Sequence, residues 1–251
     1  MELFDWTIIA VAVPAVIFAG VSKAGFGSGA AFASATILAL VMEPGEALGI
    51  MLPLLMLIDA ASLPAYWRKW SWPDARVLLW GGIPGTILGA LFYRSADPDT
   101  IRFLIGAIAI LFVGWQLAQR SGLLTLASRR FGTKTGLAAG IVLGFTSFVS
   151  HAGGPAAAIY LLGQKLDKTT YQATTVLVFW AVNLFKSGFY AFMGIFSLQT
   201  LGFDLLMAPF AILGTFLGIR AHRMVPEKVF FSLTYTLLAV TGTKLIWDAL
   251  T

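Results

Sequence analysis

The stretch GVSKAGFGSG at residues 20–29 decides how this chain folds, because it places one lysine and four glycines between two apolar runs. A related stretch, GFTSFVSHAGGP, occupies residues 144–155, and Gly20 matches Gly144 at an offset of 124 residues. Glycine breaks a helix, and Pro155 suits the first turn of a new one. Each stretch therefore predicts a broken or re-entrant helical hairpin. Such backbone is tolerated at membrane depth only inside protein or beside a polar cavity.

The two halves of the chain match each other well beyond these stretches, at offsets that drift from 124 to 128 residues. The matches include Asp59 with Asn183, Ile87-Leu88-Gly89 with Ile212-Leu213-Gly214, and Pro98-Asp99 with Pro226-Glu227. An internally duplicated apolar chain is typical of secondary transporters. We expect a first membrane repeat over residues 1–125 and a second over residues 126–251, which together form one transmembrane domain.

The composition indicates an all-α integral membrane protein. Hydrophobic residues make up 58% of the chain and charged residues 12%, about half of the charge of a soluble domain. Ten apolar segments are visible, at residues 6–22, 27–42, 47–67, 76–93, 101–119, 134–150, 154–164, 171–194, 202–219 and 228–248. The segment at 154–164 is too short to span a bilayer comfortably. Cysteine is absent, which excludes disulfides and thiol chemistry.

The distribution of charge predicts the topology. Of the 17 basic residues, 12 fall in four connections, at Arg68–Arg76, Arg120–Lys134, Lys165–Lys168 and Arg220–Lys228. The positive-inside rule places these connections in the cytoplasm and both termini outside the inner membrane of a bacterium. The two repeats are then inverted, each with one hairpin and three spanning helices. Five full crossings per repeat satisfy the same charge distribution.

Four ionisable residues lie far from any connection, namely Lys23, Asp59, His151 and Lys186. A charge at the bilayer centre costs at least about 2.5 kcal/mol, so each is a candidate functional residue. The alternative for each is a buried polar contact between helices, or snorkelling to the interface. Lys23 is predicted to be an unpaired cation, whereas Lys244 is expected to pair with Asp248 one turn further on.

An inverted repeat brings the two hairpin tips together near the midplane. New helices are expected to begin at about Gly27–Ala30 and Gly154–Ala156, and helix N-termini with nearby glycines are suited to binding anions. Close helix packing is the alternative role of the glycines. The candidate substrate-binding residues are Lys23, Gly25, Gly27, Ser28, Gly29, Ser147, Ser150, His151, Gly153 and Gly154.

Asp59, Asn183 and Lys186 are candidate coupling or gating residues, since Asp59 and Asn183 occupy equivalent places and Lys186 lies one turn beyond Asn183. Two roles stay open for Asp59. It neutralises Lys23 or Lys186 when no substrate is bound, or it carries a coupled proton. His151 is a second group that could titrate near neutral pH. No metal or cofactor is predicted.

The motif Gly20-x-x-Lys23-x-Gly25-Phe26-Gly27, together with Gly144-Phe-x-Ser-x-x-x-x-Ala-Gly153-Gly154-Pro155, resembles the sulfite exporter TauE/SafE family over essentially the whole chain. The resemblance implies a small permease that moves sulfite, sulfonates such as sulfoacetate, or related organic anions, usually outward. The chain departs from the family pattern at Ala24, where glycine is commoner, and at His151.

These observations predict a membrane carrier that exports small sulfur-containing anions by alternating access, and not an enzyme. Two alternatives remain. One is an intramembrane enzyme like undecaprenyl-pyrophosphate phosphatase, although the hairpin tips lack the carboxylates and arginines that such chemistry needs. The other is an anion channel. The expected partners are the lipid bilayer and a small anion. Nucleic-acid binding is excluded, because the basic residues are confined to short connections near the membrane. The sequence leaves the oligomeric state open.

Overall fold

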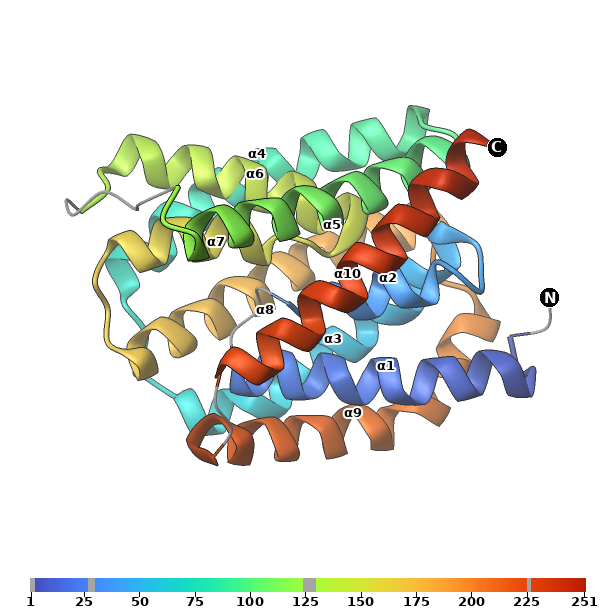
Figure 1. Ribbon diagram of the computed structural model, residues 1–251, viewed down its shortest axis with the longest axis horizontal. Coiled ribbons are helices and arrows are strands. Elements are labelled where there is room, and N and C mark those ends of the chain that lie inside the picture. The colour runs from blue at the N-terminus through green and yellow to red at the C-terminus, as the bar shows by residue number, and fades with distance from the viewer. Residues whose placement is uncertain (1–2, 27–29, 124–129, 225–226) are drawn as a thin grey trace.

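The computed structural model describes residues 3–26, 30–123, 130–224 and 227–251, apart from the side chains of 222–231. These residues form ten helices and no strand (Figure 1). The helices of the first half are α1 (Trp6–Gly25), α2 (Ala33–Leu38), α3 (Pro44–Tyr66), α4 (Trp72–Ser95) and α5 (Pro98–Arg120). Those of the second half are α6 (Thr133–Ser150), α7 (Gly154–Gly163), α8 (Lys168–Phe192), α9 (Leu198–Met224) and α10 (Glu227–Leu250).

Six helices within the described residues are long and apolar enough to cross a membrane, namely α1, α3, α4, α5, α8 and α9. Large apolar side chains such as Phe192 and Leu205 are exposed on the outer surface, as expected where lipid is the solvent. Helix α7 has ten residues and a length of about 15 Å, half of the hydrocarbon thickness. The predictions of an all-α protein and of a short seventh segment are confirmed.

Acidic side chains fix where two of these helices begin. Asp97 accepts a hydrogen bond from the backbone N–H of Thr100 at the start of α5. Asp167 accepts from the N–H groups of Thr169 and Thr170 at the start of α8. Such caps satisfy N–H groups that have no partner within the helix. The N–H and hydroxyl of Thr100 hold the pKa of Asp97 below its usual value, and the hydroxyl and N–H of Thr170 do the same for Asp167.

The first hairpin differs from the prediction. Helix α1 continues to Gly25, so Lys23 lies in its last turn and not between two helices. The next helix, α2, begins at Ala33 and not at 27–30, and it has only six residues. Residues 27–29 lie outside the described part of the chain.

The same helix packing occurs twice. Helix α1 packs against α9, and α6 packs against α4. At Gly20 an added Cβ would lie 2.6 Å from the backbone N of Thr215, and at Gly144 it would lie 2.7 Å from that of Thr86. In both pairs, therefore, a glycine lets two helix backbones approach closely.

These contacts correct one detail of the predicted duplication. Gly214 contacts Ile17 in α1, and Gly85 contacts the matching Ile141 in α6. Gly85 and not Gly89 is therefore the counterpart of Gly214, at an offset of 129 residues instead of 125. The two alignments differ by four residues, which is close to one helical turn of 3.6 residues. They place glycine on the same face of the helix, so the sequence pattern cannot separate them.

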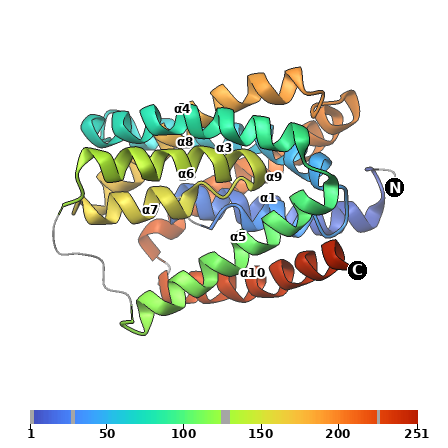
Figure 2. The same cartoon turned by 90° about the horizontal axis from the view of Figure 1, so that it is seen from above.

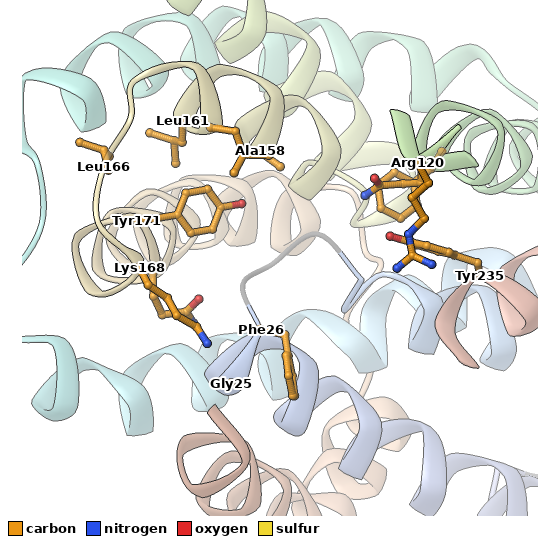
Figure 3. Close-up of a pocket in the computed structure, with 13 residues that line it drawn as sticks. Gly25, Phe26, Arg120, Ala158, Leu161, Leu166, Lys168, Tyr171 and Tyr235 are labelled. Atoms are coloured by element: carbon orange, nitrogen blue, oxygen red, sulfur yellow. The ribbon is translucent and has the colours of Figure 1, made fainter. Parts of the chain in front are cut away.

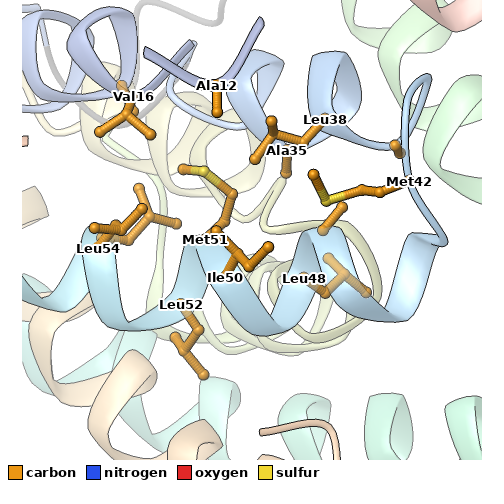
Figure 4. Packing of buried hydrophobic residues seen from close by; sticks show 14 of the residues in the cluster. Ala12, Val16, Ala35, Leu38, Met42, Leu48, Ile50, Met51, Leu52 and Leu54 are labelled. Atoms are coloured by element: carbon orange, nitrogen blue, oxygen red, sulfur yellow. The ribbon is translucent and has the colours of Figure 1, made fainter. Parts of the chain in front are cut away.

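Helix α3 lies at the centre of the largest apolar cluster (Figure 4). Leu48, Ile50, Met51 and Leu52 are all fully buried, although they point to different sides of the helix. Figure 4 shows Met51 directed toward Ala12, Ala35 and their neighbours in α1 and α2. A helix that is apolar on all sides belongs in a protein interior. Polar groups on α3 are therefore held deep inside the molecule.

The chain begins and ends at the same end of the molecule. Figures 1 and 2 both show the start of α1 and the end of α10 at one end, and the end of α5 with the start of α6 at the opposite end. The starts of α4, α6 and α8, beside which the sequence places basic residues, lie at this second end (Figures 1 and 2).

Candidate functional site

A buried ion pair joins α1 to α3. The ammonium of Lys23 pairs with the carboxylate of Asp59, and the two side chains are 3% and 0% exposed. The other carboxylate oxygen of Asp59 accepts a hydrogen bond of 3.1 Å from the amide of Asn183 in α8. Gln172, also in α8, donates its amide N–H to the backbone carbonyl of Lys23 at 2.7 Å. Helix α8 thus holds both partners of the pair in place.

A second buried lysine, Lys186, lies one turn beyond Asn183 in α8 and is fully buried. Its ammonium lies 2.8 Å from the carbonyl oxygen of Ser147, 3.3 Å from the hydroxyl of Ser147 and 2.8 Å from Nδ1 of His151. Three acceptors match the three N–H groups of a charged ammonium. All three are neutral, and none of the described carboxylates forms an ion pair with Lys186.

His151 connects the second hairpin to α3. It ends α6 in the left-handed conformation, with φ of 56°. Nε2 lies 3.0 Å from the carbonyl oxygen of Leu48, which can only accept, so Nε2 carries the ring proton. Nδ1 is then the acceptor for Lys186. Both ring nitrogens of the neutral imidazole have partners within the protein. In this conformation, therefore, neither nitrogen can donate a hydrogen bond to an anionic ligand.

These groups form one elongated polar cluster, composed of Lys23, Asp59, Asn183, Lys186, His151 and Ser147. The cluster extends along α3 from the carbonyl of Leu48, which His151 contacts, to Asp59. These two residues lie about 16 Å apart along the helix, given a rise of 1.5 Å per residue. The formal charges of Lys23 and Asp59 cancel, so the formal charge of the cluster, +1, is that of a protonated Lys186.

The cluster follows the internal duplication. At the offset of 124 residues that relates Asp59 to Asn183, Lys23 corresponds to Ser147 and Ser62 corresponds to Lys186. In both halves, the contact therefore joins the first helix of the half to its third. The residue types differ between the halves. In the first half the charges of Lys23 and Asp59 cancel, whereas in the second half Lys186 contacts the neutral Ser147.

The predicted site residues divide into several groups. Ser147 accepts from Lys186, whereas the hydroxyl of Ser150 donates to Thr146 in its own helix at 2.8 Å. Gly25 and Gly153 have close packing contacts with α9 and α8, where an added Cβ would collide with Gly218 and Phe179. Gly154 is the buried first residue of α7. Gly27, Ser28 and Gly29 fall outside the described residues.

Two expectations about lysines have clear outcomes. Lys23 was expected to be unpaired, but Asp59 neutralises it, which agrees with one of the two roles left open for Asp59. Of the two buried lysines among the described residues, Lys186 is the one without a carboxylate partner. The expected pair between Lys244 and Asp248 is confirmed.

Sequence reasoning missed several buried polar residues, among them Gln172 and Asp204. Gln172 is 2% exposed and holds the backbone of Lys23. Asp204 in α9 is 7% exposed, and neither of its carboxylate oxygens has a hydrogen-bond partner in the described part of the chain. Asp204 lies near the start of a predicted apolar segment, where a carboxylate is ordinarily solvated, so its burial is visible only in the structure.

Long apolar helices around a buried charged centre define a multi-pass membrane protein of the transporter class. The model of the sulfite exporter TauE/SafE family matches residues 12–245, which is nearly the whole chain. The chain belongs to this family of membrane transporters for sulfite-type anions, as the two glycine-rich motifs predicted. A search of curated proteins and a search of solved structures each found no match.

Proposed function

We propose that this protein is a secondary carrier that exports small sulfur-containing anions, such as sulfite or sulfoacetate, and binds them beside Lys186. One observation carries the proposal. The ammonium of Lys186 is fully buried, and its three hydrogen-bond partners are all neutral. A buried charge without a counter-ion is costly, and an anion beside Lys186 would remove that cost.

The groups around Lys186 suit the oxygens of a sulfite or sulfonate. An anion would replace one or more of the three neutral acceptors of Lys186. Ser147 has a hydroxyl, and Asn183 has an amide one turn away from Lys186 on the same helix. A bound monoanion would bring the net charge of the cluster to zero. Lys23 would not contact the anion in this arrangement. Its role would be to neutralise Asp59, so that the positive charge of Lys186 is left for the anion.

The transport mechanism that we propose is alternating access between two inverted repeats. The repeated packing of α1 on α9 and of α6 on α4 supports this arrangement, as do the opposite directions of α1 and α6 in Figure 1. The polar cluster joins helices from both repeats, so rocking one repeat against the other would change which side reaches Lys186. The hairpin of α6 and α7 would be re-entrant, since α7 is too short to cross.

The charge distribution supports export from a bacterial cytoplasm. We propose that the basic end of the molecule faces the cytoplasm and that both termini face outside the inner membrane. A membrane potential of 100 mV, negative inside, then favours anion export by about 2.3 kcal/mol per charge. Export therefore needs no coupled ion. Proton coupling through His151 or Asp59 stays a prediction.

Flux assays with purified protein in proteoliposomes test this function. We expect flux of sulfite and sulfoacetate that responds to the membrane potential, weaker flux of taurine because its ammonium would meet Lys186, and almost no flux of any of them through Lys186→Gln. Lys244→Gln, which alters an exposed lysine away from the cluster, is the matched control and should transport normally. The absence of flux for every sulfur anion with folded wild-type protein would reject the proposal.

A further inference from the structure

A cavity of about 530 Å³ opens at the end of the molecule where α5 ends and α8 begins (Figure 3). Its walls come from α1 and α5 of the first half and from α7, α8 and α10 of the second. The volume lies within the range of small-molecule sites in proteins. By the charge distribution, this end is the one that we place in the cytoplasm.

Cationic and hydroxyl groups line two facing sides of this cavity. Figure 3 shows Arg120 and Tyr235 on one side, and Lys168 and Tyr171 on the other. The guanidinium of Arg120 lies over the ring of Tyr235, with 4.9 Å between its central carbon and the ring centroid. A guanidinium carries five N–H groups in one plane, and two of them suit two oxygens of one anion. Among the residues that the structure describes, the lining contains no aspartate or glutamate.

Apart from the amides of Gln116 and Gln172, the rest of the described wall is apolar. Ala158, Leu161 and Leu162 of α7 and Phe112 of α5 line the space between the polar sides. An inorganic oxyanion would leave this surface without a partner, whereas a short hydrocarbon attached to a sulfonate would cover it. The lining therefore favours an organic anion.

The cavity reaches the polar cluster through one side chain. Gln172 lines the cavity and donates its amide N–H to the carbonyl of Lys23. Gly25, two residues after Lys23, lines the cavity as well. An anion in this cavity is thus separated from the Lys23–Asp59 pair by the last turn of α1 and by Gln172.

We propose that this cavity is a second anion site, which holds a short organosulfonate through Arg120 and Lys168 before the anion passes to Lys186. This inference rests on the proposed transport function and narrows the substrate class to organic anions. Gln172 is a positioning residue between the two sites.

The absence of native cysteine allows a direct binding test on the full-length protein in proteoliposomes. Ala158→Cys places a single thiol in the wall of the cavity, and Ser121→Cys places one on the exposed surface at the same end. We expect sulfoacetate to slow thiol labelling at 158 but not at 121. Sulfate, which has no hydrocarbon, should need a higher concentration to give the same protection.

Arg120→Gln in the Ala158→Cys background should raise the half-protecting concentration of sulfoacetate about 10- to 100-fold. The control Arg130→Gln changes an exposed arginine of the same end that does not line the cavity, and should have no effect. Intact sulfoacetate transport without protection at 158, or with equal protection in Arg120→Gln, would overturn this inference alone. Absence of both transport and protection would overturn the proposed function and the inference with it.

Discussion

At the scale of single residues, the pairing of the buried charges determines their expected effects on stability and on ligand binding. Lys23 and Asp59 form a pair that is almost completely buried, whereas Lys186 has only neutral acceptors. A buried pair contributes little net stability, but the loss of one partner leaves an uncompensated charge. Lys23 and Asp59 are therefore expected to behave as one unit in stability, and Lys186 as the group that responds to a ligand.

Lys23→Met and Asp59→Leu should each destabilise the protein by about 3–5 kcal/mol, because each leaves one buried charge unpaired. The double variant should recover most of this loss, since both charges are gone. Thermal unfolding in detergent measures the three variants. Additive losses in the double variant would show that the two residues are not energetically paired.

Asp204→Asn should raise the unfolding temperature at pH 8 and leave it almost unchanged at pH 4. Neither carboxylate oxygen of Asp204 has a hydrogen-bond partner in the described residues, so an ionised carboxylate is costly there. At pH 4 a protonated carboxyl and an amide are both neutral, and the difference disappears. An unfolding temperature lowered at both pH values would mean that Asp204 forms a contact that stabilises the fold.

At the scale of elements, glycines determine how closely the helices pack. Gly20 and Gly144 let α1 and α6 approach the backbones of α9 and α4. Gly114 in α5, by contrast, has no atom within 4 Å of the position that a Cβ would occupy. The three glycines look alike in sequence, and only the packing distinguishes them.

Gly20→Ala should lower the unfolding temperature clearly, because its Cβ would lie 2.6 Å from the backbone N of Thr215 and the helices must separate. The matched change Gly114→Ala should leave the unfolding temperature unchanged or raise it, since alanine is the better helix former by about 1 kcal/mol. If the two variants lose the same stability, the account of α1 and α9 packing is incorrect.

At the scale of the whole molecule, the fold places its two ends together and its basic connections opposite (Figures 1 and 2). In the proposed membrane orientation, each half crosses the membrane an odd number of times. A membrane potential that is negative inside would then drive a bound anion toward the end that holds the termini.

Single-cysteine labelling in intact cells tests the orientation. Thr251→Cys should react with a membrane-impermeant thiol reagent from outside, and Ser121→Cys should react only after the membrane is permeabilised. Both positions are exposed, so accessibility within the protein does not limit the reaction. Labelling of both from the same side would contradict the odd number of crossings, and the reverse pattern would contradict cytoplasmic placement of the basic end.

Much of this architecture could be predicted from the sequence, because hydrocarbon imposes strict rules. Apolar runs predicted the long helices, and the rarity of buried charge singled out Lys23, Asp59, His151 and Lys186. All four lie in the polar cluster.

The pairing of these charges could not be predicted. Asp59 could neutralise Lys23 or Lys186, and the choice depends on side-chain geometry between helices distant in sequence. Gln172 and Asp204 carry no sequence signal, because a polar residue near a helix end is ordinarily solvated. The alignment of α4 with α9 was wrong by one turn for a different reason. Positions one turn apart lie on the same face of a helix, so the sequence pattern fits both alignments.

The central claim is that Lys186 binds the transported anion, and the equilibrium affinity of purified protein for sulfoacetate tests it most directly. Lys186→Gln should weaken binding about 10- to 100-fold, because a hydrogen bond to a charged group contributes about 1.5–3 kcal/mol. Lys186→Arg should retain part of the affinity, and Lys244→Gln should bind as wild type does. Wild-type affinity in a Lys186→Gln variant that unfolds at the normal temperature would contradict the claim.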